Sequence, residues 1–218
     1  MAIGYHIERV GDLPDVDPRL ILIQKPSNGW PLLEEEELES RLAVIRNSST
    51  LEELRNQPDI AAYRQFYWGL GIDPTKRRPS AEALVRRIIA GKPFPRINPI
   101  VDRYNLISAE NRISIGALST DYLSDKKLTM RMARQGEPFL GIGFPKPKPC
   151  TGQELVLSID EQIIALYPYR DSHNTRIRGD DSAVLFTLCE VPGIEESLIE
   201  KAAQSLKSDF SYYKTTLV

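Results

Sequence analysis

Apolar residues at helical spacing, separated by short polar stretches, characterise the first half of the chain. Leu20–Gln24 is a brief apolar run after an Asp-Pro step, and it predicts an opening strand. Residues 32–45 (LLEEEELESRLAVI) place acids early and an arginine late, as the helix dipole favours, and predict a helix. Two more helices are expected, one over Ser49–Asn56 with Ser49 or Thr50 as its cap and one over Asp59–Gly69.

The strongest helical signal lies between Pro79 and Gly91. Ser80, directly behind the proline, is a residue type that caps helix N-termini, and a glycine just past the last turn suits a helix end. The side chains expected on the buried face are Leu84, Val85, Ile88 and Ile89. The pattern therefore predicts an amphipathic helix with Arg86 on its flank.

Asn98 followed by Pro99 forms an N-cap and first-turn pair, which predicts one further helix over Pro99–Ile107. Asp102 and Asn105 lie three residues apart on this helix, so we expect their side chains to face the same way. Such a pair either cross-links the end of a buried helix or contributes polar groups to a site.

After Ser108 the spacing changes to short β-like runs separated by Gly, Pro and Asp turns. The predicted strands are Ile113–Leu118, Lys127–Ala133, Pro138–Ile142, Glu154–Ile159, Gln162–Tyr167 and Ala183–Val191. The predicted turns are Gln135-Gly136, Lys146–Pro149 and Asp160-Glu161. An amphipathic helix around Glu195–Lys207 closes the chain. Helices followed by strands predict an α+β fold, and the absence of a sequence repeat or low-complexity linker favours one domain over 1–218.

Composition agrees with a globular protein, because 41% of the residues are apolar and 27% are charged. No apolar run approaches the roughly 20 residues of a membrane span, and the N-terminus lacks the pattern of a secretory signal. Two cysteines and two distant histidines provide neither a disulfide framework nor the spacing of a metal site. We therefore expect a cytoplasmic protein with no cofactor, no metal and no membrane partner.

Sequence motifs of common catalytic sites are missing: the chain has no G-x-x-x-x-G-K-[ST], G-x-S-x-G, H-E-x-x-H or C-x-x-C. Cys189 is expected in the core, and Cys150 lies in a Lys/Pro loop without an obvious base. Any catalysis is therefore expected to rest on positioned water and hydrogen-bond donors.

Positive charge is concentrated in residues 64–103, where nine Lys or Arg face three acids. This segment is +6 (nine minus three), and the rest of the chain is −8, within a net charge of −2. The residues that we expect to contact RNA phosphates are Lys76, Arg77, Arg78, Arg86 and Arg87. The alternative is a solvated surface that balances the acidic run Glu34–Glu37.

Four motifs occur in order between Tyr63 and Asn105. They are a G-x-D-P-[TS]-[KR] turn at Gly71–Lys76, R-P-S-x-E-A-L at Arg78–Leu84, Gly91-Lys92, and I-N-x-x-V-D-x-x-N over Ile97–Asn105. This stretch resembles the B3/B4 domain of the phenylalanyl-tRNA synthetase β subunit, in the form found in single-domain proteins. The resemblance is specific between Tyr63 and Asn105, and it is looser from there to about residue 190. It implies a B3/B4-like β-sandwich of mixed strands flanked by helices. Residues 1–60 would be an extension that completes the core, 61–191 the homologous part and 192–218 a C-terminal helix.

In the synthetase, this domain holds an editing pocket that hydrolyses tyrosine wrongly esterified to the phenylalanine tRNA. The resemblance implies a tRNA or aminoacyl-tRNA partner, or a free amino acid, and an ester hydrolase acting in trans rather than a complete aminoacyl-tRNA ligase. The family's pocket asparagine, in V-D-x-x-N, falls on Asn105. The position of the synthetase's pocket histidine is Gly116 here, and that of its glutamate is Thr187.

Because two polar groups of the synthetase pocket are replaced, other residues are expected to shape the site. The predicted catalytic residues are Asn105, Thr187 and His173, and the predicted substrate-binding residues are Asp102, Gly116, Arg170, Asp171 and Thr175. Several of them have a structural alternative. Asp102 could stabilise a helix end, Arg170 and Asp171 could form a surface ion pair, and His173 could be exposed to solvent. Two functions follow from the resemblance, a trans-editing esterase or a non-catalytic module that binds an amino acid or a tRNA end.

Overall fold

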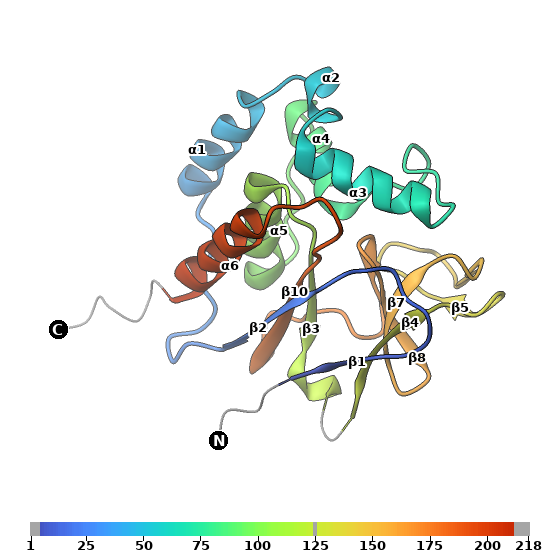
Figure 1. The fold of residues 1–218 in the computed structure, drawn as a ribbon. Coiled ribbons are helices and arrows are strands. Elements are labelled where there is room, and N and C mark those ends of the chain that lie inside the picture. The colour runs from blue at the N-terminus through green and yellow to red at the C-terminus, as the bar shows by residue number, and fades with distance from the viewer. Residues whose placement is uncertain (1–4, 124–125, 212–218) are drawn as a thin grey trace.

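The computed structural model describes residues 5–123 and 126–211, which form helices beside two β-sheets (Figure 1). The helices are α1 (Glu35–Arg46), α2 (Leu51–Leu54), α3 (Pro58–Gly69), α4 (Ser80–Ile89), α5 (Pro99–Asn111), the 3-10 helix η1 (Thr120–Tyr122) and α6 (Glu196–Ser211). The strands are β1 (Ile7–Arg9), β2 (Arg19–Gln24), β3 (Ile115–Ser119), β4 (Leu128–Met132), β5 (Pro138–Phe139), β6 (Lys148–Pro149), β7 (Leu155–Ile159), β8 (Gln162–Leu166), β9 (Arg170–Asp171) and β10 (Ala183–Leu188). This order confirms the predicted α+β class.

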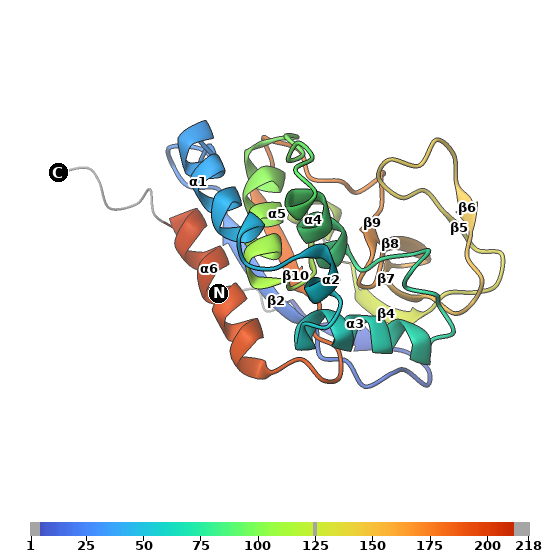
Figure 2. The same cartoon turned by 90° about the horizontal axis from the view of Figure 1, so that it is seen from above.

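The larger sheet has the strand order β1-β4-β7-β8-β9, the smaller has β2-β10-β3, and β5 pairs with β6 separately. β1 runs parallel to β4, whereas the other paired strands are antiparallel, so the predicted mixture of strands is confirmed. Figure 2 shows α1, α5 and α6 on one side of the smaller sheet and the larger sheet on the other. The smaller sheet is therefore the middle layer.

The main apolar core joins α5 and α6 to both sheets. Phe186 of β10 lies at its centre, with its ring 5.8 Å from that of Tyr104 and 5.3 Å from that of Phe210. A second core, which includes Leu42 of α1 and Val85 of α4, holds the remaining helices together. No helix among the described residues combines the length and apolarity needed to cross a bilayer.

Side-chain capping marks the starts of α2 and α5. Thr50 forms a capping box with Glu53, and the Asn98 side chain accepts hydrogen bonds from the amides of Ile100 and Val101, as expected. Ser80, however, is the first helical residue of α4, so its prediction as the N-cap is wrong by one position. The distant Ser114 supplies a hydroxyl oxygen to the first-turn amide of Ala81 instead, 3.2 Å away.

Three predicted elements differ in their bounds or type from the structure. Helix α5 continues beyond Ile107 to Asn111, whose side chain donates to the Ile107 carbonyl at 2.9 Å. The predicted turn at Lys146–Pro149 contains strand β6, and the strand predicted over Pro138–Ile142 is shortened to β5. The pairing of β5 with β6 is continued by a Cys150 amide that donates to the Glu137 carbonyl.

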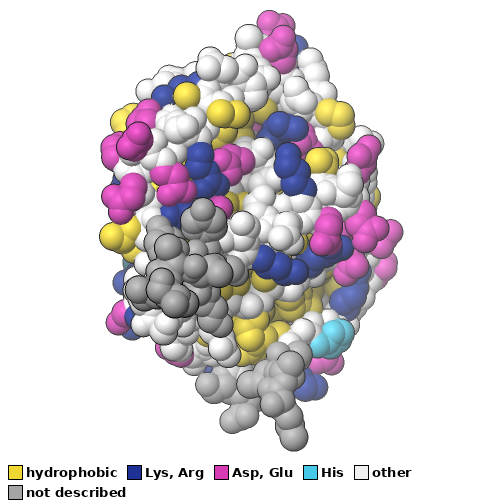
Figure 3. Space-filling view, turned by 90° about the vertical axis from the view of Figure 1, so that its left-hand side faces the viewer, with side chains coloured by type: hydrophobic (Ala, Val, Ile, Leu, Met, Phe, Trp, Pro, Cys, Tyr) yellow, Lys and Arg dark blue, Asp and Glu magenta, His cyan; other side chains and the backbone are white. Residues whose placement is uncertain are grey.

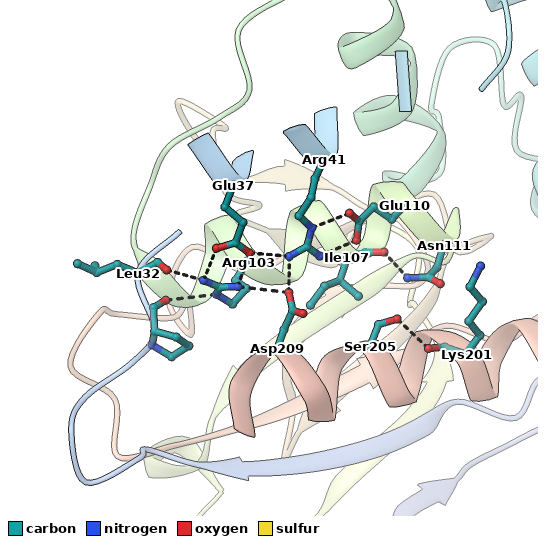
Figure 4. Close-up of polar contacts among 11 residues, drawn as sticks. Leu32, Glu37, Arg41, Arg103, Ile107, Glu110, Asn111, Lys201, Ser205 and Asp209 are labelled. Atoms are coloured by element: carbon teal, nitrogen blue, oxygen red, sulfur yellow. Dashed lines mark hydrogen bonds and ion pairs between the residues drawn. The ribbon is translucent and has the colours of Figure 1, made fainter. Parts of the chain in front are cut away.

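A cluster of ion pairs joins α1, α5 and α6 (Figure 4). Arg103 is buried and lies 2.9 Å from Glu37 and 3.4 Å from Asp209. Arg41 contacts the same two acids and Glu110, the last at 2.6 Å. Arg103 thus balances part of the acidic run Glu34–Glu37 at the start of α1, but it does so from a buried position and not from the solvated surface that the alternative interpretation expected. On the face drawn in Figure 3, Lys and Arg are interspersed with Asp and Glu.

Candidate functional site

A cavity of about 810 Å³ lies where α4 and α5 approach the two sheets. Its inner wall is formed by apolar side chains of both sheets, such as Leu118, Leu157 and Ile164. Its polar groups come from α4 and the loops on either side of it, and from α5, β3, β9 and β10. The cavity therefore combines apolar walls with polar groups that can orient a ligand, as ligand pockets usually do.

Asn105, Gly116 and Thr187 line this cavity together, although they lie on three different elements. Thr187 of β10 is the direct cross-strand partner of Gly116 of β3, which fixes their relative position. Within the described part of the chain, the side-chain amide of Asn105 and the hydroxyl of Thr187 have no hydrogen-bond partner. Both groups are therefore free to bond a ligand.

Asp171 lines the cavity opposite Gly116. Its Oδ2 accepts a hydrogen bond from the Ala117 amide at 3.2 Å, and its Oδ1 lies 3.0 Å from the position that a Cβ at residue 116 would occupy. Burial raises the pKa of Asp171 to about 7, against the opposing effects of the Ala117 amide and the Arg170 charge. A carboxylate from β9 thus occupies the space that a side chain at position 116 would need.

Arg170 and Asp171 lie in the described part of the chain and form no ion pair with each other, so the surface-pair alternative is wrong. The Arg170 guanidinium instead donates to the Ile142 carbonyl and lies over the rings of Phe144 and Tyr169, at 5.3 Å and 5.0 Å. Gly141 makes room for it, because a Cβ there would lie 2.8 Å from Arg170 Cδ.

The outer part of the cavity is strongly basic. The cations that line it are Lys76, Arg78, Arg86, Arg87 and Lys92, from α4 and the loops on either side of it. Arg77, which was predicted with them, does not line the cavity, because its guanidinium bonds Glu154 at 2.9 Å and lies over the Tyr169 ring. We refer to the five lining cations as the basic rim.

Beneath the basic rim lies a fully buried carboxylate, that of Glu82. It bonds Arg64 at 2.9 Å, and Arg78 and Arg86 each approach it to 4.0 Å. Burying a carboxylate without such partners would be costly, so the three arginines compensate for the burial of Glu82, and Glu82 in turn positions them.

Besides Arg77, three predicted site residues lie outside the cavity lining. The Asp102 carboxylate accepts from the amides of Ile97 and Asn98 and pairs with Arg96 at 3.0 Å, so it has the helix-end role. His173 is exposed, since its amide donates to the Leu140 carbonyl in a bend that turns the side chain to solvent. Thr175 is buried away from the cavity.

Other lining residues were not predicted from the sequence. Lys92 belongs to the basic segment of the sequence and directly follows Gly91, at the end of α4. Because Arg86 and Arg87 lie near the same helix end, this position could have indicated that Lys92 joins the basic rim. Tyr104 and Cys189 carry no such signal, because the packing of α5 and of the segment after β10 brings them to the cavity. Burial, and then the nearby Asp171, raises the pKa of the Tyr104 hydroxyl and of the Cys189 thiol, so both are neutral at pH 7.

The described residues contain no group of three or more His, Cys, Asp or Glu side chains that could hold a metal ion. The charged groups of the cavity are therefore the basic rim, Arg170 and Asp171. This arrangement can bind anionic groups outside and can offer hydrogen bonds and one titratable carboxyl inside.

Comparison with known proteins gives a match to a sequence family and matches to solved structures. The sequence profile of the B3/4 domain matches residues 62–215. An N-terminal fragment of the phenylalanyl-tRNA synthetase β subunit from Pyrococcus horikoshii is similar in structure, with 12% identity and a TM-score of 0.44. The match covers 95% of this chain and 50% of that one, so the chain spans about half the length of the fragment. No curated protein sequence matches the chain.

Proposed function

The chain belongs to the B3/4 domain family, and from this premise we propose that it binds the aminoacylated 3′ end of a tRNA in the cavity. The observation that carries the proposal is the position of Asn105 in one cavity with the basic rim. A tRNA end presents phosphates beside a small acyl group, and the cavity offers cations outside and apolar walls inside.

The basic rim is suited to phosphate because its charge is only partly neutralised. Glu82 is shared among three arginines, and Lys76 has only a long contact of 3.9 Å with Asp73. The protein as a whole carries a net charge of −2, so attraction to RNA has to come from this local surface.

Binding can be tested by fluorescence anisotropy with labelled aminoacyl-tRNA over a series of salt concentrations. We expect Lys76→Ala to weaken binding and to reduce the salt slope by about 0.7, the value of one single-strand phosphate contact. Lys201→Ala on α6 is the matched control, because this exposed lysine is not among the lining residues and should leave the slope unchanged. Equal effects of the two changes, or no binding by the unchanged protein, would refute the proposal.

A second candidate function is hydrolysis of the aminoacyl ester, favoured by the unpaired side chains of Asn105 and Thr187. In this reaction water attacks the ester carbon, and the carbonyl oxygen becomes an oxyanion to which the Asn105 amide donates. The carbon–oxygen bond to the ribose then breaks. A proton from the attacking water passes to the ribose oxygen, which leaves a free amino acid and an uncharged tRNA.

Deacylation of a panel of aminoacyl-tRNAs, beginning with phenylalanine tRNA charged with tyrosine, tests this second function. We expect Asn105→Ala to slow the reaction roughly 100-fold, as removal of an oxyanion donor does. Lys201→Ala should have no effect. If every aminoacyl-tRNA decays with protein as it does in buffer, hydrolysis is refuted while binding stands.

A further inference from the structure

We propose that Asp171 receives the free amine of the aminoacyl group, so that the cavity selects ligands with an unblocked α-ammonium. This inference rests on the proposed binding of an aminoacylated tRNA end and names the group that the inner cavity recognises. It assigns a specificity-determining role to a residue on β9, outside the four motifs between Tyr63 and Asn105 that carry the specific part of the resemblance.

The geometry of the Asp171 carboxylate carries the inference. One oxygen, Oδ2, is held by the Ala117 amide at 3.2 Å, which fixes the orientation of the group. The other oxygen, Oδ1, has no hydrogen-bond partner within the described part of the chain. It lies 3.0 Å from the point at which a Cβ would be placed on Gly116. An oriented carboxylate with a free oxygen in a cavity wall is a ready acceptor for an ammonium group.

Among the described residues, no Lys, Arg or His forms an ion pair with this carboxylate, and the charge of Arg170 acts on it only without direct contact. The neighbouring Arg170 is engaged by the Ile142 carbonyl and two aromatic rings. The other titratable groups that face Asp171 are Tyr104 of α5 and Cys189 after β10, and both are neutral at pH 7. Asp171 therefore has no directly bonded cation within the described part of the chain, and an aminoacyl ligand brings one.

The distribution of charge over the cavity fits the same ligand. The basic rim lies at the outer part, and Asp171 lies beside Gly116 and Thr187 in the inner part. An aminoacylated nucleotide has the complementary order, with phosphates at one end and an ammonium at the other. A ligand whose amine is acylated carries no charge to offset the ionisation of Asp171, and it is therefore expected to bind more weakly.

Binding of an ammonium also predicts a definite pH dependence. The ligand binds the ionised carboxylate, and the pKa of Asp171 is raised to about 7 in the free protein, so affinity should fall as the pH drops below about 7. It should fall again above about 8, where an α-amino group loses its proton. The affinity for a ligand without the amine should fall in neither pH range.

The test uses stable amide analogues of the charged tRNA end, built on 3′-amino-3′-deoxyadenosine 5′-phosphate. Alanyl, leucyl, phenylalanyl and tyrosyl amides are each compared with the acyl amide that lacks the α-amine, by isothermal titration calorimetry at pH 7.5. We expect the unchanged protein to prefer at least one amine-bearing analogue by roughly tenfold or more. Asp171→Asn should abolish that preference while it leaves the affinity for the amine-free analogue within about twofold.

The outcomes separate this inference from the proposed function. Equal affinity of the unchanged protein for both members of every pair refutes the role of Asp171 and leaves tRNA-end binding intact. A preference that persists in Asp171→Asn also refutes it. Binding of no analogue refutes both, provided that Asp171→Asn and the unchanged protein show the same folded circular dichroism spectrum. A tenfold preference lost in Asp171→Asn, with the pH profile above, supports both.

Discussion

Asp171 and Gly116 share one space in the cavity wall. The carboxylate oxygen Oδ1 of Asp171 lies 3.0 Å from the point at which residue 116 would carry a Cβ. The two residues are 55 positions apart in the chain (171 minus 116), on β9 and β3, and the glycine is what permits the carboxylate to approach. A side chain at position 116 and an inward Asp171 are therefore mutually exclusive.

Replacement of this glycine tests the relationship directly. Gly116→Ala should lower the free energy of unfolding by about 1 kcal/mol, because a methyl group forces the carboxylate away from the Ala117 amide. The measurement is urea unfolding at pH 7. In the double variant Gly116→Ala, Asp171→Ala the added methyl should cost almost nothing, so the two changes should be non-additive.

Gly69→Ala is the matched control for the added methyl. Gly69 ends α3 with a φ outside the left-handed region, and a Cβ there would meet no atom within 4 Å. Its replacement should be neutral or slightly stabilising. Strict additivity of the changes at 116 and 171 would contradict the shared space.

The stability of the protein should depend on pH through Asp171. The pKa of this residue is about 7 in the folded protein and about 3.9 in an unfolded chain. Between these values the folded state holds a proton that the unfolded state has lost. The free energy of unfolding should therefore fall as the pH rises from about 4 to 7.

Asp171→Asn removes this contribution, since asparagine stays neutral and still accepts from the Ala117 amide. Compared with the unchanged protein, the variant should gain stability of about 3 kcal/mol between pH 4.5 and pH 8. Urea unfolding at the two pH values measures the difference. A stability difference that is the same at both would contradict the raised pKa.

Local sequence signals predicted the helices well because their information lies within one turn. Thr50 with Glu53 and Asn98 before Pro99 specify helix starts through contacts of three residues or fewer. The cap of α4 was misplaced because its partner, Ser114, lies 34 residues beyond Ser80 in the chain (114 minus 80). Strand β6 was predicted as a turn, since a Lys/Pro sequence becomes a strand only through pairing with β5.

The site was predicted only in part, for a similar reason. Asn105 and Thr187 were found because the shared motif and a strand pattern mark them, and both line the cavity. His173 was selected by residue type alone, yet a bend after β9 exposes it. Arg77 and Arg78 are adjacent in sequence but have different partners. Arg77 pairs with Glu154 and Arg78 approaches Glu82, and only the folded structure shows this difference.

Arg103 is predicted to be a strong contributor to stability. Its side chain is 4% exposed, and it serves Glu37, Asp209 and the Leu32 carbonyl at once (Figure 4). Arg103→Met keeps much of the side-chain volume but removes the hydrogen-bond donor of these acceptors. The free energy of unfolding should therefore fall by about 3 kcal/mol. Thermal or urea unfolding gives the value.

Arg46→Met provides the comparison for Arg103, because Arg46 pairs with Glu39 at 3.0 Å on the more exposed side of the same region. Its replacement should change stability by about 0.5 kcal/mol or less. Similar losses for the two variants would mean that the cluster between α1, α5 and α6 contributes no more than a surface ion pair.

Replacement of Glu82 should affect both the stability of the protein and the arrangement of the basic rim. The carboxylate is fully buried and bonds Arg64 at 2.9 Å, with Arg78 and Arg86 at 4.0 Å. Glu82→Gln preserves shape and removes the charge, which leaves partly buried guanidinium groups facing each other. We expect the free energy of unfolding to fall by about 3 kcal/mol, measured in urea.

Glu52→Gln supplies the control for Glu82, since Glu52 is 84% exposed and contacts Arg55 at only 3.9 Å. Because its charge is solvated in both the folded and the unfolded state, its replacement should leave the unfolding midpoint nearly unchanged. The repulsion among the arginines in Glu82→Gln is electrostatic, so part of its loss should be recovered at high salt, where such repulsion is screened. A small loss, or one that salt does not reduce, would show that Glu82 does not hold these arginines together.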